Sequence, residues 1–189
     1  LREGTTKYTA ATIAEKLDYY GSWLELSSSS EYAYITVYSL NKYLAKTLEV
    51  VESMIKEPVF PEKELHTILD TNIQQYLVNT SKVDFLAHRG LLQALYGTQH
   101  PCGQIVVEED YHAIIPEVLR DFYGRHYHSG NCSIFLSGKV TEDIIRRVTG
   151  AFGTPFGQYQ LKASKPIFSF VAVPEKRIFI EREDALQSA

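Results

Sequence analysis

The residue types that commonly bind metals come close together where His66 and Asp70 stand four positions apart. On a helix, both side chains would share one face and could supply two ligands of a zinc or manganese site. Two ligands do not make a site, because protein zinc sites use three or four. We therefore favour a surface pair that flanks a buried stripe formed by Leu65, Leu69 and Ile73.

Asn72 is a polar residue on the expected inward side of the same helix. It lies three positions after Leu69 and one before Ile73, so helical geometry puts its amide on or beside the buried face. A buried amide needs hydrogen-bond partners. We expect either a hydrogen-bonded core asparagine or a polar group that faces a cleft.

Other candidate chemistry is weaker. His126 and His128 flank Tyr127 at the expected end of a helix, where the two imidazoles diverge and a solvated terminus is the favoured interpretation. No glycine-rich loop opens a helix, and no serine stands in a Gly-x-Ser-x-Gly elbow. Nucleophilic hydrolysis therefore has no candidate residue.

Hydrophobic periodicity predicts the elements that position these residues. A 3.6-residue repeat predicts helices over residues 9–20, 41–57, 61–76, 83–96, 110–127 and 141–152. Asn41 and Thr141 are expected N-caps, and Gly21 and Gly97 are expected helix stops. Alternating patterns predict strands at 23–27, 32–38, 132–136 and 177–183. The strand at 32–38 puts tyrosines on one face, either as a ligand wall or as packing against another layer.

The bulk composition is that of an ordinary globular protein. Of 189 residues, 44% are hydrophobic and 22% are charged, and the net charge is −4. Scattered lysines and arginines form no basic stripe, so no nucleic-acid partner is expected. No apolar run is long enough to span a membrane, which favours a soluble protein. Cys102 and Cys132 form no metal or redox motif and leave the compartment open.

An ordered series of short motifs runs along nearly the whole chain. The series comprises Leu1-Arg2-Glu3-Gly4-Thr5, Gly21, Phe60-Pro61-Glu62, Tyr96-Gly97-Thr98-Gln99-His100-Pro101, Phe122-Tyr123, Gly138-Lys139-Val140-Thr141 and Phe152-Gly153. Each motif is weak alone, but their order resembles the pitrilysin/insulinase (M16) zinc-peptidase family, to which the mitochondrial processing peptidases belong. The resemblance implies an α+β fold, with an antiparallel-rich sheet covered by helices, as in one half of an M16 chain.

The resemblance also implies where a metal and a substrate would lie. M16 peptidases bind zinc through a His-x-x-Glu-His motif and a glutamate from a later helix. That third-ligand position falls on Asn72 here, and Asp70 is the carboxylate beside it. An amide oxygen is a poor zinc donor, so the family pattern implies a metal-free half. The substrate-binding edge strand of the family would comprise Trp23, Leu24, Glu25 and Leu26, with Glu25-Leu26 in place of the usual Asn-Ala.

We therefore expect a non-catalytic half that lines a peptide chamber and pairs with a homologous half, in the same or a separate chain, which holds the zinc. No catalytic residue and no cofactor are expected in this chain. One alternative is an active half whose His-x-x-Glu-His motif precedes residue 1 and whose third ligand is Asp70. Another is a structural or assembly subunit with the M16 fold. The expected domains are 1–153, an α+β domain truncated at its N-terminus, a linker over 154–176, and the start of a second domain at 177–189.

Overall fold

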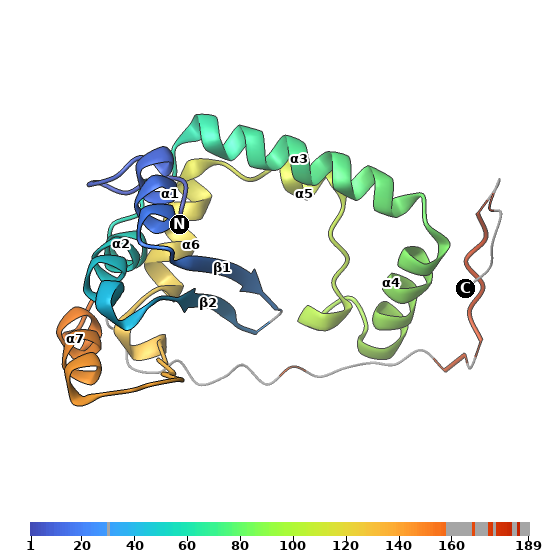
Figure 1. Ribbon diagram of the computed structural model, residues 1–189. Helices are drawn as coiled ribbons and strands as arrows, with labels where there is room; N and C mark the ends of the chain where they lie inside the picture. The colour runs from blue at the N-terminus through green and yellow to red at the C-terminus, as the bar shows by residue number, and fades with distance from the viewer. Residues whose placement is uncertain (30, 158–167, 169–173, 176, 183–184, 186–189) are drawn as a thin grey trace. The chain divides into compact units, whose positions relative to one another are not determined.

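The computed structural model describes residues 1–29, 31–157, 168, 174–175, 177–182 and 185. Over these residues the fold is α+β, with several helices and a two-stranded antiparallel sheet, as the sequence predicted (Figure 1). The chain divides into two compact units. Unit 1 comprises Leu1–Leu65 and Ile115–Ala163, and unit 2 comprises His66–Ile114 and Ser164–Ala189.

Helix α1 of unit 1 spans Ala10–Tyr19 and forms close to its predicted bounds. Its N-cap is Thr9, whose Oγ1 accepts a hydrogen bond from the Thr12 amide at 3.2 Å. Beyond its end, Gly21 takes a φ of +59°, a left-handed conformation that glycine adopts without steric cost. Ile13 and Leu17 are buried, as their helical spacing predicts.

The β-hairpin follows α1 directly. Strand β1, Trp23–Ser28, pairs antiparallel with β2, Ala33–Tyr38, in a continuous register from Trp23 opposite Tyr38 to Ser28 opposite Ala33. Both strands were predicted within one residue of these bounds. Leu24, Leu26, Ile35 and Val37 share one face of the hairpin, because opposite residues of a ladder point to the same side.

Helix α2, Leu44–Lys56, supplies more buried residues than any other helix described. Val50 and Met54 pack with Ile13 and Leu17 of α1, and Leu24 of β1 packs against this cluster. Asn41 is not the N-cap that the sequence predicted. It begins a short 3₁₀ turn, Asn41–Tyr43, and its Nδ2 donates to the carbonyl of Lys139 at 3.0 Å. The side-chain amide is therefore used to fix a distant turn.

The C-terminal helices of unit 1 are α6, Pro116–His126, and α7, Glu142–Phe152. The predicted helix over 110–127 is instead two helices, because Pro116 starts α6 at its first position and α5, Glu108–His112, ends before it. Thr141 caps α7 as predicted, with its Oγ1 accepting from the Ile144 amide.

Two predicted strands are absent from the part of the chain that the structure describes. Residues 132–136 are all exposed and residues 177–182 are irregular, with no ladder partner among the described residues. An alternating apolar pattern forms a strand only when another strand satisfies its backbone groups. The predicted linker at 154–176 falls largely outside the described residues, as do residues 183–184 and 186–189 of the region 177–189, so the proposed domain bounds remain a prediction.

Unit 2 contains most of α3, Glu62–Thr80, together with α4, Val83–Tyr96, and α5. Helix α4 ends at Gly97, as predicted, and the short 3₁₀ turn Pro101–Gly103 packs against it. A Cβ on Gly103 would lie 2.0 Å from the Gly97 carbonyl oxygen, so the turn and the helix end approach very closely. Gly103 is the one buried residue among those described in this unit.

Candidate functional site

Strand β1 has an open outer edge. The Ser29 amide donates to the Tyr32 carbonyl at 2.8 Å, which makes these two residues a hydrogen-bonded pair at the end of the ladder. Hydrogen-bonded and non-hydrogen-bonded pairs alternate along antiparallel strands, so Leu24 and Leu26 direct their amides and carbonyls away from β2. Within the described residues the sheet contains only β1 and β2, and these outward groups are therefore available to an added strand.

Buried hydroxyls attach the hairpin to α2. Thr47 of α2 is fully buried, and its Oγ1 lies 2.7 Å from Ser22 Oγ and 3.0 Å from Ser39 Oγ. Ser22 immediately precedes β1 and Ser39 immediately follows β2, so a single α2 side chain holds both open ends of the hairpin. Buried hydroxyls that satisfy one another in this way fix an orientation as well as adding stability.

The two faces of the hairpin differ in exposure. Ile35 and Val37 are half-buried, whereas Trp23, Tyr34 and Tyr38 on the opposite face are 66%, 51% and 58% exposed. The alternation predicted from the sequence is therefore confirmed. The tyrosine-bearing face meets no packing layer within the described residues, although packing was the more common explanation for such a row.

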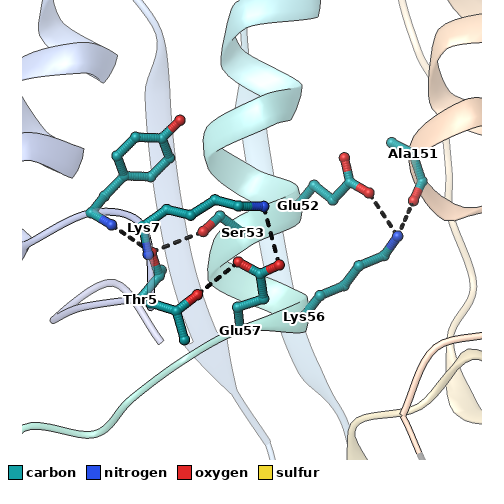
Figure 2. A network of polar contacts seen from close by, with 9 residues as sticks. Thr5, Lys7, Glu52, Ser53, Lys56, Glu57 and Ala151 are labelled. Atoms are coloured by element: carbon teal, nitrogen blue, oxygen red, sulfur yellow. Dashed lines mark hydrogen bonds and ion pairs between the residues drawn. The ribbon is translucent and has the colours of Figure 1, made fainter.

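A second polar network fixes the segment before α1 (Figure 2). Thr5 Oγ1 accepts hydrogen bonds from Ser53 Oγ at 2.8 Å and from the amides of Tyr8 and Lys7 at 2.9 and 3.1 Å. At the end of α2, the Glu57 carboxylate accepts from Lys7 Nζ at 3.1 Å and from Thr6 Oγ1 at 2.9 Å, and these two bonds lower the pKa of the Glu57 carboxyl. Gly4-Thr5, which contributed to the family resemblance, therefore has a structural role, because Thr5 joins the segment before α1 to helix α2.

The possible metal ligands on α3 are not assembled into a site. His66, Asp70 and Asn72 are all exposed, and α3 has no buried residue. Asn72 is therefore not the core asparagine that the sequence suggested, because the helix lacks the buried face on which that interpretation depended. Among the described residues, no group of three or more His, Cys, Asp or Glu side chains could hold a metal ion. These residues do not fit a zinc site.

The two histidines at the end of α6 differ in exposure, and only His126 lies in solvent. His126 is exposed and lies beside the Phe122 ring at 4.6 Å, whereas His128 is only 8% exposed. Within the described residues, His128 Nδ1 has no hydrogen-bond partner. The expectation of solvent exposure was wrong for His128, because the chain after α6 folds back and the Ser129 amide donates to the Phe156 carbonyl.

Sequence reasoning missed a cavity within unit 2. It has a volume of about 760 Å³, and the extended residues 104–107 form much of its wall, together with Gln93, Thr98, Gly103, Asp110, Tyr111 and Ile114. The Asp110 carboxylate accepts from the Val107 amide at 2.8 Å, which holds the wall against α5. An irregular loop lines this space, so no periodic pattern could have identified it.

Comparison with known proteins decides the family. The model of the insulinase family, peptidase family M16, matches residues 1–105, which is more than half of the chain. The chain belongs to the M16 family. A second model, described as the peptidase M16 inactive domain, matches residues 113–189 of this M16 chain.

Relatives with assigned names are distant and longer. The M16 chain is 24% identical over 145 residues to an uncharacterized zinc protease of Rickettsia felis and 25% identical over 154 residues to the uncharacterized zinc protease YmxG of Bacillus subtilis. It is 26% identical over 171 residues to mitochondrial-processing peptidase subunit alpha-1 of Dictyostelium discoideum. The matches cover 76%, 80% and 88% of this chain but only 35%, 37% and 26% of the relatives.

Solved structures share the fold. A peptidase M16 inactive domain from Pseudomonas fluorescens matches with a TM-score of 0.73 at 23% identity, over 88% of this chain and 42% of that one. A protease from Helicobacter pylori matches with a TM-score of 0.78 at 14% identity, over 89% and 42% of the two chains. In the described residues of the M16 chain, no helix combines the length and apolar character needed to cross a bilayer.

Proposed function

We propose that this chain acts as a metal-free half of an M16 peptidase, in which the open edge of β1 binds an extended peptide by strand addition. A homologous half, in the same or a separate chain, would supply the zinc and the hydrolytic chemistry. The names of the relatives support this role, since they include zinc proteases and a subunit of a processing peptidase.

The observation that carries the proposal is the outward direction of the Leu24 and Leu26 backbone groups on β1. Strand addition draws its affinity from main-chain hydrogen bonds, so it accepts many side chains and suits a protein that handles varied unfolded peptides. The hydrogen bonds of Ser22 and Ser39 to Thr47 keep the hairpin in one orientation, which lowers the entropy cost of ordering the hairpin when a peptide binds.

A proline at position 26 tests the edge directly. Leu26→Pro removes an outward amide and fixes φ. An edge strand tolerates both changes, but an incoming peptide cannot form its hydrogen bond with the missing amide. Leu26→Ala is the matched control, because it removes the same side chain and keeps the amide. We expect Leu26→Pro to weaken both the binding of a fluorescein-labelled twelve-residue unfolded peptide and its turnover in the presence of a catalytic M16 half. Equal binding and turnover by the two variants would exclude β1 as the peptide site.

Metal analysis separates this proposal from an active half. Asp70 and Asn72 are exposed, and among the described residues neither belongs to a group of three or more potential metal ligands. We therefore expect no tightly held zinc in protein that has been dialysed against zinc. One zinc per chain, lost in Asp70→Ala, would identify an active half instead. Unchanged assembly and unchanged peptide turnover in a correctly folded Leu26→Pro variant would favour a purely structural subunit.

A further inference from the structure

Glu25 is the single charged residue of the two strands. The sequences of β1 and β2 contain no lysine or arginine, so this carboxylate is not neutralised from within the hairpin. It is exposed on the same face as Trp23 and lies opposite Thr36, with Tyr34 and Tyr38 as its diagonal neighbours on β2. One negative charge therefore shares a face of the hairpin with three exposed aromatic residues.

The position of Glu25 in the ladder brings it close to an added strand. Leu24 and Leu26 direct their backbone groups outward, so they would form the hydrogen-bonded pairs with a peptide. Glu25 would then occupy the non-hydrogen-bonded pair between them. Side chains are closest in such pairs, with Cβ atoms about 4.5–5.5 Å apart. The peptide residue opposite Glu25 would consequently have its side chain directly over this carboxylate.

We propose that β1 selects peptides with a lysine or arginine opposite Glu25, with the cationic group held by the Glu25 carboxylate and the face of Trp23, the neighbour of Glu25 on the same face of β1. This inference rests on the proposed strand addition and adds a side-chain preference to it. Opposite charges attract across a ladder, and cations bind aromatic faces, most strongly that of tryptophan. Both effects act on the peptide side chain opposite Glu25.

The size of the preference follows from the exposure of the site. Solvent screens an exposed ion pair, and an exposed cation–π contact is similarly weak, so each contributes only a small factor. We expect arginine to be preferred over norleucine at the central position by about 5-fold at low salt. Because the Debye length falls to about 3 Å at 1 M salt, the electrostatic part of this preference should disappear there.

The test uses two labelled decapeptides that alternate threonine and valine and differ only in a central arginine or norleucine. Fluorescence anisotropy measures the binding of each to the protein and to Glu25→Gln, with Glu31→Gln as a matched control in the adjacent turn. We expect Glu25→Gln to reduce the arginine preference from about 5-fold to about 2-fold, the part that the Trp23 ring contributes, while norleucine binding stays within about 2-fold. Glu31→Gln should keep the full preference. An arginine preference that keeps its full size in Glu25→Gln overturns the inference.

Leu26→Pro distinguishes failure of this inference from failure of the proposed function. Weaker binding of both peptides by Leu26→Pro, with no arginine preference in the unaltered protein, retains strand addition and rejects the role of Glu25. Unchanged binding of both peptides by Leu26→Pro rejects strand addition itself. A concentration-dependent dimer in sedimentation, lost in Trp23→Ser and accompanied by no peptide binding, would assign the aromatic face to a second copy and also overturn the inference.

Discussion

Helices α2 and α4 are similar in length and rich in apolar residues, yet they are buried very differently. The 13 residues of α2 include five buried ones: Thr47, Val50, Val51, Ser53 and Met54. The 14 residues of α4 include none, and Leu91 and Leu95 are 55% and 48% exposed. The difference shows that apolar content does not determine burial. Helix α2 has α1, the hairpin and α7 as partners, whereas the described residues around α4 offer mainly one short turn.

The strongest test of this comparison removes the side chain at the centre of unit 1. Met54 is fully buried, so Met54→Ala should leave a cavity and lower the free energy of unfolding of unit 1 by about 2–5 kcal/mol. Hydrogen exchange of α2 peptides, followed by mass spectrometry in increasing urea, measures this change. Leu91→Ala in α4 is the matched control and should cost less than about 0.5 kcal/mol. Equal losses would show that α4 is buried as deeply as α2.

A smaller effect is expected from Gly103→Ala in unit 2. The added Cβ would collide with the Gly97 carbonyl, and that contact is backbone, which cannot move aside as a side chain can. We expect the turn 101–103 to separate from α4 and the amides of both to exchange faster, while α2 amides exchange at the original rate. Faster exchange throughout α2 and α4 alike would contradict the division into separate units.

Proteolysis tests the proposed linker between residues 154 and 176. Proteases cut first where the backbone is least packed, and we expect the first cleavage between Gly153 and Pro174. Brief digestion followed by intact-mass measurement locates this cut. A first cleavage within residues 41–57 would contradict the domain boundary, because α2 is the best-buried helix described.

The smallest expected effect concerns Glu57 and pH. Hydrogen bonds from Lys7 and Thr6 hold the pKa of Glu57 below its usual value in the folded state. A depressed folded pKa stabilises the protein at pH values above the unfolded pKa, and this stabilisation is lost as pH falls through the folded pKa. Glu57→Gln should therefore lower the melting temperature slightly at pH 7 and leave it unchanged in strong acid. An equal decrease at both pH values would attribute the effect to packing.

Local signals in the sequence predicted most of the elements. Gly21, Gly97 and Thr141 act through their own backbone or the next turn, so their roles could be read from neighbouring residues. The irregular chain at 132–136 could not be predicted in this way, since a strand requires a partner strand, which can lie far away in the sequence.

The candidate site was only partly predictable. The alternating residues predicted the position of β1 and the two faces of the hairpin, and the family resemblance implied that β1 is a substrate-binding edge. The outward direction of the Leu26 amide depends on the Ser29–Tyr32 hydrogen bond, which sets the phase of the whole ladder. The exposure of Asn72 also escaped prediction, because helical spacing identifies a shared face but not whether another element covers it.

The contacts of Lys56 have a consequence for its chemical reactivity. Its ammonium group donates to Glu52 at 2.7 Å and to the Ala151 carbonyl of α7 at 2.6 Å, and it lies 5.8 Å from the ring centres of Phe152 and Phe156. Its side chain is only 21% exposed, compared with 59% for Lys7 and 57% for Lys46. An acylating reagent should therefore modify Lys56 after both of these lysines. The onset of its modification during denaturation would report the moment at which α7 leaves α2.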